Sequence, residues 1–192
     1  MKLILCSEGF STREIVDKCI ELVGKPKNLI NVAVINEAYA VETNNLRWTL
    51  NNLTKVTENF GGNLELVNLL ALDGQEVKQR VEASDVIYVL GGHTDYLMSV
   101  LNKSGFSKLL PDLLKTKVYV GSSAGSMVLG KRLSSQVYEK IYSERNDYGI
   151  DRYLEFVDIS IMPHLDSPNF PNRRETLLEA SANPRCNLWL KR

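Results

Sequence analysis

The stretch that decides the fold is KVYVGSSAGSMVLG, residues 117–130. It opens with a short apolar run, passes through the small residues Gly121 to Gly125, and continues as a second apolar run. A buried strand that enters a helix through a G-x-S-x-G turn is the context of a nucleophile elbow, in which the central serine projects from the turn. The sequence therefore predicts a strand over 117–121, a turn centred on Ser123, and a helix after it.

Four similar apolar runs come earlier in the chain, separated by helix-like or turn-rich segments. They are LILC (3–6), NVAVI (31–35), LELVNLLAL (64–72) and DVIYVLGG (85–92). Because these runs show no polar alternation, we expect strands that are buried on both faces. Strands that alternate with helices indicate a parallel sheet with right-handed crossovers. The predicted fold class is a three-layer, doubly wound α/β fold with a mainly parallel sheet, and residues 1–192 form a single domain.

The pattern changes after residue 130, where three further elements are expected. They are an edge strand or ribbon at SQVYEKIY (135–142), a strand at FVDISIM (156–162) and a last helix over 172–182. This part of the chain therefore adds two strands and a helix to the predicted domain.

The composition excludes several classes of function. The 192 residues carry 23 Lys plus Arg and 23 Asp plus Glu, so the formal net charge is zero, which argues against a general nucleic-acid binder. No apolar run approaches the roughly 20 residues of a membrane span, and the apolar start of the chain is too short for a signal peptide.

The three cysteines are widely spaced and form no C-x-x-C pair, so neither a metal site nor a cofactor is expected. We expect a cytoplasmic protein. The oligomeric state is left open, and a homo-oligomer is compatible with the sequence.

The candidate site lies at the predicted turn, because ligands of open α/β sheets bind beyond the carboxyl ends of the strands. Ser123 is the predicted nucleophile, and the Ala124 N–H is expected to point at a developing oxyanion. The chain has two histidines, His93 and His164. His164 follows the serine in the chain order Ser…acid…His, so we favour it as the base that takes the Ser123 proton. His93 then lines the pocket or caps its own helix.

A second turn of small residues, Leu90-Gly91-Gly92-His93-Thr94, follows the fourth apolar run. Glycines after a buried strand leave backbone N–H groups open, which suits a second oxyanion donor or a phosphate cradle. Neither a G-x-x-x-x-G-K-[ST] nor a G-x-G-x-x-G motif occurs in the chain, so a nucleotide site is not supported. An ordinary strand-to-helix turn with Thr94 as N-cap is the alternative.

The acid that would orient the histidine is the least determined member of the site. The candidate carboxylates are Glu139, Glu144, Asp147, Asp151, Glu155, Asp158 and Asp166. Glu139 is favoured because it lies on the predicted ribbon 135–142, and Glu144 comes next. Asp166 is two residues past His164 and is also within reach of it.

These residues resemble the dipeptidase E and cyanophycinase family of serine peptidases. The resemblance runs through most of the chain. It rests on the glycine turn near residue 90, on GSSAGSM (121–127), and on MPH (162–164) followed by NRRETLLE (172–179). It implies a flavodoxin-like, class I glutamine-amidotransferase-like fold. It also implies a peptide substrate, cut next to an aspartyl residue.

Carried over residue by residue, the resemblance implies a role for each member of the site. The roles are Ser123 as nucleophile, His164 as base, Gly92 and Ala124 as oxyanion donors, an acid near Glu139, and Arg174 as the side chain that binds the substrate carboxylate. A guanidinium suits that last role because it is always charged and can bind a carboxylate through two hydrogen bonds.

The chain departs from the family pattern at the glycine turn, where the family usually has Gly-Gly-Gly-Asn-Thr. One glycine is missing and His93 replaces the asparagine, so we expect a different pocket floor that His93 helps to line. Two other functions stay open on the sequence alone. One is a non-peptidase esterase or thioesterase, which shares the elbow, and the other is a catalytically inactive regulatory homologue.

Overall fold

The structure is a computed structural model, and it describes residues 1–43, 47–61, 63–165, 167–170, 173 and 175–176. Its centre is a five-stranded sheet in the order β1-β5-β4-β2-β3. The strands are β1 (Lys2–Cys6), β2 (Val32–Ile35), β3 (Leu64–Leu66), β4 (Val86–Val89) and β5 (Val118–Ser122). The pairings between these neighbours are parallel. The predicted mainly parallel α/β sheet is therefore confirmed.

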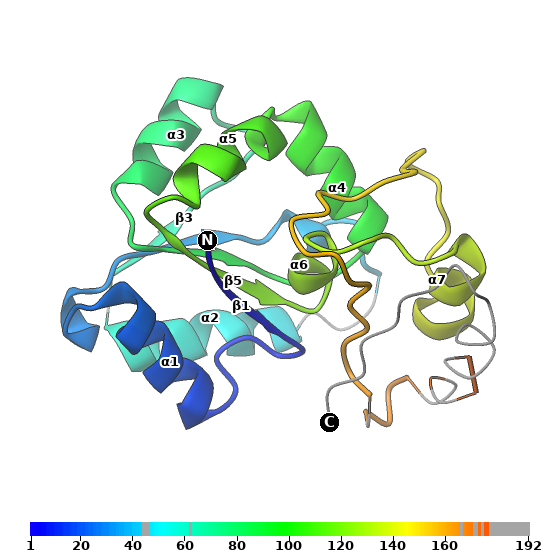
Figure 1. The fold of residues 1–192 in the computed structure, drawn as a ribbon, viewed down its shortest axis with the longest axis horizontal. Helices are drawn as coiled ribbons and strands as arrows, with labels where there is room; N and C mark the ends of the chain where they lie inside the picture. The colour runs from blue at the N-terminus through cyan, green and yellow to red at the C-terminus, as the bar shows by residue number, and fades with distance from the viewer. Residues whose placement is uncertain (44–46, 62, 166, 171–172, 174, 177–192) are drawn as a thin grey trace.

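Helices cover both faces of the sheet and give the three predicted layers (Figure 1). One face carries α1 (Arg13–Val23) and α2 (Arg47–Phe60). The other carries α3 (Gly74–Glu82), α4 (Thr94–Lys103) and α5 (Phe106–Leu113). Shorter elements are the turns η1 (Lys27–Leu29) and η2 (Glu37–Tyr39) and the helices α6 (Ala124–Met127) and α7 (Ser135–Tyr142). No helix in the described part of the chain is long and apolar enough to cross a membrane.

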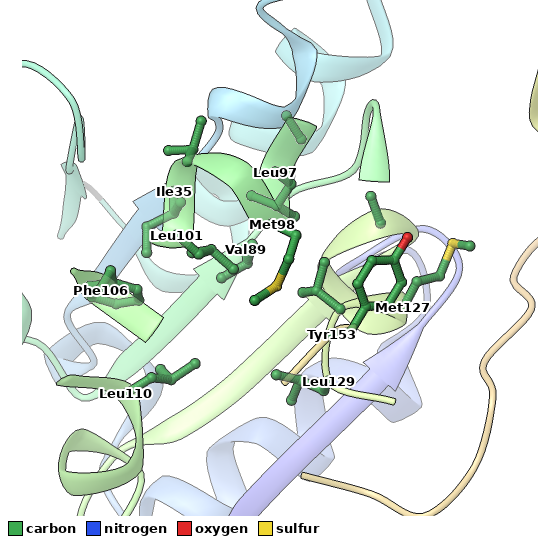
Figure 2. Packing of buried hydrophobic residues seen from close by; sticks show 14 of the residues in the cluster. Ile35, Val89, Leu97, Met98, Leu101, Phe106, Leu110, Met127, Leu129 and Tyr153 are labelled. Atoms are coloured by element: carbon green, nitrogen blue, oxygen red, sulfur yellow. The ribbon is translucent and has the colours of Figure 1, made fainter. Parts of the chain in front are cut away.

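The three central strands, β2, β4 and β5, are buried on both faces because their side chains alternate between two apolar cores, whereas the edge strands β1 and β3 are only partly buried. On the side of α1 and α2 the core contains Val32, Val34, Tyr88 and Val120. On the other side Ile35 and Val89 pack with Leu97, Met98, Leu101, Phe106 and Leu110 of α4 and α5 (Figure 2). This double burial explains why the sequences of the three central strands are apolar without alternation.

Residues 135–142 form helix α7, so the predicted edge strand at this position is wrong. The Ser134 hydroxyl caps the helix by accepting the Val137 N–H at 3.4 Å. Val137, Tyr138 and Ile141 are buried, and residues three and four apart share one face of a helix. The strand prediction overlooks this helical spacing.

Residues 156–162 do not form a strand either. The segment is irregular, with only an isolated bridge at Ser160. Its backbone hydrogen-bonds to the segment that follows the elbow, as in the 3.1 Å bond from the Val157 N–H to the Leu129 carbonyl. The apolar side chains of this stretch are therefore held by a packed loop instead of a sheet.

Two other predicted elements differ in extent. The strand predicted over 64–72 ends at Leu66, and a turn follows in which Asn68 Oδ1 accepts the N–H groups of Leu70 and Ala71. Of the helix predicted over 172–182, the described residues 173, 175 and 176 are helical, and the rest lies outside the described residues.

Candidate active site

Ser123 joins β5 to α6 in a strained turn. Its φ is 50° and its ψ is −114°, a combination that non-glycine residues rarely adopt. The glycines on either side are required by space. A Cβ on Gly121 would lie 2.6 Å from the Gly125 carbonyl oxygen, and a Cβ on Gly125 would lie 2.1 Å from the Val89 carbonyl oxygen. The G-x-S-x-G pattern thus has the strand-turn-helix geometry that the sequence predicts.

The structure brings Ser123 and His164 together. His164 Nε2 lies 2.9 Å from Ser123 Oγ, which is hydrogen-bond distance. The imidazole stacks on Phe170, with ring centroids 4.9 Å apart and ring planes at 21°. The His164 backbone N–H donates to the Ser7 hydroxyl at 3.0 Å. The histidine is therefore held both at its ring face and at its backbone.

The electrostatic surroundings of His164 favour its neutral form. Burial lowers the pKa of His164, the positive charge of Arg173 lowers it further, and the negative charge of Glu8 opposes both effects. The ring is therefore neutral at neutral pH. A neutral imidazole can accept the Ser123 proton, so this pair has the geometry and the protonation state of a nucleophile and its base.

The Gly91–Gly92 turn passes directly against Ser123. A Cβ on Gly91 would lie 2.8 Å from Ser123 Cβ, and Gly92 has a φ of 131°, with the Ala38 carbonyl 2.4 Å from any added Cβ. Within the described residues, the N–H groups of Gly92 and Ala124 make no hydrogen bond. Both of the predicted oxyanion donors are therefore free to bind a ligand beside Ser123.

His93 is the N-cap of helix α4 and directly follows this turn. Its Nδ1 accepts the Tyr96 N–H at 3.3 Å, so the ring proton resides on Nε2. The His93 ring meets Tyr148 edge-on, with centroids 5.2 Å apart. The alternative of Thr94 as N-cap is wrong, because Thr94 is the first residue of the helix and His93 is the cap.

Glu144 lies beside His93 and not beside His164. Its carboxyl accepts the Thr94 N–H at 3.0 Å and the Thr94 hydroxyl at 3.3 Å. Burial raises the pKa of Glu144 to about 8, although the bonds from Thr94 lower it, and burial also lowers the pKa of His93. The 3.7 Å approach of Glu144 Oε2 to His93 Nδ1 is therefore a contact between neutral groups and not an ion pair.

The structure does not bring the favoured acid, Glu139, to the histidine. The Glu139 side chain is 62% exposed and pairs with Arg145 at 3.6 Å. Asp158 is exposed and pairs with Lys131. Within the described residues no carboxylate hydrogen-bonds to the His164 ring, and the candidate Asp166 lies outside those residues.

The arginine that lies beside the pair is Arg173. Its side chain is buried, and its guanidinium carbon is 5.8 Å from the centre of the Phe170 ring, on which His164 stacks. Its charge acts on the pKa of both His164 and Tyr142. Arg174, the residue that the resemblance indicates, lies outside the described residues.

Ser7 and Glu8 are the members of this region that the sequence prediction missed. They follow β1 directly, and the carboxyl ends of parallel strands meet at one edge of the sheet. That rule was a usable signal, since β1 was predicted as a strand and the next two residues are polar.

A parallel α/β sheet that carries a serine on an elbow, with a histidine on its hydroxyl, is the arrangement typical of serine hydrolases. The family comparison narrows this class. Residues 4–188 match peptidase family S51, and the chain belongs to that family.

Individual relatives agree with this assignment. A Listeria monocytogenes protein described as an uncharacterized peptidase is 28% identical over 119 residues, which are 60% of this chain and 57% of that relative's length. A similarly described Pasteurella multocida protein is 23% identical over 172 residues, or 89% of this chain and 80% of the relative. A solved Listeria monocytogenes structure, provisionally named peptidase E, has a TM-score of 0.75 at 22% identity and covers 95% of this chain and 87% of its own. That structural likeness supports the fold.

Proposed function

We propose that this chain is a serine peptidase that hydrolyses short peptides at aspartyl residues, with Ser123 as nucleophile and His164 as base. The observation that carries the proposal is the 2.9 Å contact between His164 Nε2 and Ser123 Oγ at a strained elbow. Membership of peptidase family S51 supports peptide bonds as the substrate class.

The chemistry follows from these positions. His164 Nε2 takes the Ser123 proton as the serine oxygen attacks the carbonyl carbon of the scissile bond, and the oxyanion that forms accepts hydrogen bonds from the N–H groups of Gly92 and Ala124. His164 then gives the proton to the leaving amine, and an acyl-enzyme ester remains on Ser123. A water molecule, deprotonated by His164, cleaves the ester and returns the serine.

We assign the aspartyl preference to the arginine pair Arg173–Arg174. The chain has a formal net charge of zero, so attraction of an acidic side chain has to be local. Arg173 acts electrostatically on His164, and Arg174 is the next residue along the chain. Replacing each arginine by Gln in turn tests which of the two binds the substrate carboxylate. The arginine that binds the carboxylate is the one whose loss abolishes the preference for Asp-X over Asn-X dipeptides.

The acid of the proposed triad has two candidates besides Glu139. Glu8 acts on His164 through its charge, and Asp166 is close to it in sequence. Replacing an orienting acid by its amide lowers kcat by about 10⁴-fold in triad enzymes. Comparing Glu8→Gln with Asp166→Asn therefore identifies the acid.

The test of the proposal is Ser123→Ala. We expect hydrolysis of Asp-X dipeptides to fall by about 10³-fold or more, and labelling by a fluorophosphonate to disappear, while the circular dichroism spectrum is unchanged. Ser122→Ala is the matched control, because Ser122 is the neighbouring hydroxyl and donates to the Ser7 carbonyl at 3.4 Å. Unchanged turnover in Ser123→Ala would sink the proposal.

A ligand-binding role without catalysis is the second candidate. It is favoured by one observation, that no described carboxylate hydrogen-bonds to the His164 ring. Wild-type protein that binds an Asp-X dipeptide by calorimetry, but neither cleaves it nor reacts with a fluorophosphonate, would establish this role in place of the peptidase.

A further inference from the structure

The carboxyl end of β1 contacts both members of the Ser123–His164 pair. The Cys6 carbonyl accepts the Ser123 N–H at 3.0 Å. The next residue, Ser7, accepts the His164 N–H on its hydroxyl oxygen, also at 3.0 Å. Two consecutive residues therefore hold the backbone of the nucleophile and the backbone of the base, which are 41 residues apart in the chain.

The Cys6 end of this bridge is fixed to the sheet and to the elbow. Cys6 pairs in register with Ser122 of β5. Its N–H donates to the buried Ser126 hydroxyl at 2.9 Å, and that hydroxyl also lies 2.7 Å from the Gly121 carbonyl. Ser7 therefore extends from a rigid support, in register with the turn that carries Ser123.

The His164 end needs such a support. His164 has a φ of 64°, a left-handed conformation that residues other than glycine adopt only where the surroundings hold them. The segment around it is irregular. The bond that the Ser167 N–H donates to the His164 carbonyl and the stacking on Phe170 come from the same segment and would move with it.

Among the described residues, two bonds anchor the backbone of Pro163 and His164 themselves to the rest of the protein. The Tyr142 hydroxyl donates to the Pro163 carbonyl at 3.4 Å, near the limit of a hydrogen bond. The shorter bond is the one from His164 to Ser7. Of these two bonds, only the bond to Ser7 joins His164 to the end of β1, which also holds the Ser123 backbone.

We propose that Ser7 is a positioning residue of the site: its hydroxyl fixes the strained backbone of His164 so that Nε2 stays within hydrogen-bond distance of Ser123 Oγ. The proposal rests on the proposed function, because it assumes that this distance limits catalysis. Ser7 itself exchanges no proton with substrate in this scheme.

The first experiment measures the rate of Ser123 labelling by a fluorophosphonate in wild type, Ser7→Ala, Ser7→Thr and Ser104→Ala. Ser104 is the matched control, because its hydroxyl also accepts a backbone N–H, that of Phe106 at 3.3 Å, but at the end of α4 away from the site. A misplaced reacting group costs up to about 100-fold in rate. We expect Ser7→Ala to label about 10- to 100-fold more slowly, and Ser7→Thr and Ser104→Ala to label close to the wild-type rate.

The second experiment reads the position of His164 without any reaction. The chain has two histidines, so their imidazole NMR signals can be assigned with His93→Gln. In wild type, burial and Arg173 hold the pKa of His164 below its ordinary value. In Ser7→Ala we expect this pKa to rise toward the ordinary value, while the pKa of His93 stays unchanged as an internal control for folding.

The outcomes separate the two proposals. Wild-type protein that does not label overturns the proposed function, and the positioning role falls with it. Wild type that labels, with Ser7→Ala labelling equally fast and an unchanged His164 titration, overturns the role of Ser7 alone. Equal slowing in Ser7→Ala and Ser7→Thr also overturns it, since the hydroxyl would then not be what matters.

Discussion

The two parts of the chain on either side of residue 130 hold their structure in different ways. Residues 1–130 contain the whole sheet and the helices α1 to α6, and their interior is apolar. The described residues after 130 contain helix α7 and otherwise mainly irregular backbone, yet they supply His164. Figure 1 shows this second part lying beside the layered sheet, along the side where α4 and α6 lie. The base of the proposed site thus comes from the less regular part. That part also extends one apolar core of the sheet part, with Leu133, Val137, Tyr138, Ile141, Ile150 and Tyr153.

Buried polar contacts between the two parts add to this apolar packing. Asp95, in the first turn of α4, is 1% exposed and receives two bonds from the Arg132 guanidinium, at 3.1 and 2.6 Å. The Tyr153 hydroxyl donates to the same carboxylate at 2.7 Å. Arg132 also lies over the Tyr138 ring, 5.1 Å from its centre. A single buried carboxylate of the sheet part thus binds two side chains of the irregular part, and one of them packs on a third.

The largest loss of stability is expected when the Asp95 carboxylate is removed. Asp95→Ala leaves the Arg132 guanidinium buried without its partner, and breaking a buried ion pair in this way costs about 3–5 kcal/mol. We expect the free energy of unfolding in urea to fall by that amount, and peptidase activity to be lost at lower urea than the helical signal. Asp112→Ala, which breaks the exposed pair with Lys115, is the control and should have no measurable effect. A small loss in Asp95→Ala would mean that apolar packing holds both parts alike.

The next largest loss of stability is expected at Glu144, which joins the irregular part to the glycine turn through its hydrogen bonds with Thr94. Glu144→Ala leaves the buried Thr94 N–H without an acceptor, which costs about 1–3 kcal/mol. Glu144→Gln keeps an oxygen for that N–H and removes the titration. We expect Glu144→Ala to be less stable than Glu144→Gln at pH 5, as measured by urea unfolding. Equal stabilities would contradict a role for the Thr94 bond.

The pH dependence of the stability of wild type and Glu144→Gln sharpens this prediction. The pKa of Glu144 in the folded protein, about 8, is above the ordinary value of 4.5 for a glutamate. Between these values the folded protein keeps the proton and the unfolded chain releases it, so the contribution of Glu144 to stability falls as pH rises. The Gln variant should therefore gain stability relative to wild type from about pH 4.5 to 8. A difference that does not change with pH would refute the raised pKa.

A smaller loss of stability is expected from a substitution in the apolar core. Ile35 is fully buried between β2 and the helices on its face, and Ile→Val deletes one methylene, which costs about 0.5–1.5 kcal/mol. We expect the midpoint of urea unfolding to fall, while the activity of the folded protein stays the same, because Ile35 packs in the core with α4 and α5 (Figure 2). A loss of activity larger than the loss of folded protein would show that the apolar core also tunes the site.

The same contrast explains what the sequence could predict. The sheet was readable because buried parallel strands are uniformly apolar, and the elbow was readable because Gly121 and Gly125 are required by contacts under 3 Å. In the irregular part, short apolar stretches resemble strands, and the helical spacing of Val137, Tyr138 and Ile141 is a signal that the strand prediction overlooks. The choice of Glu139 as the acid rests on that strand prediction. The bond from the His164 N–H to the Ser7 hydroxyl spans 157 residues, and no local pattern in one sequence reports a contact over that separation.

The smallest effect is expected for Glu139→Gln. The side chain projects from α7 into solvent at 62% exposure, and its pair with Arg145, at 3.6 Å, is of the surface kind that contributes little. We expect stability to change by less than about 0.5 kcal/mol and kcat for an Asp-X dipeptide to stay at the wild-type value, whereas His164→Ala, measured beside it, should lose nearly all activity. If Glu139→Gln instead lost activity to a similar degree, α7 would have to turn this carboxylate toward His164 during catalysis. The irregular part would then supply both the base and its acid.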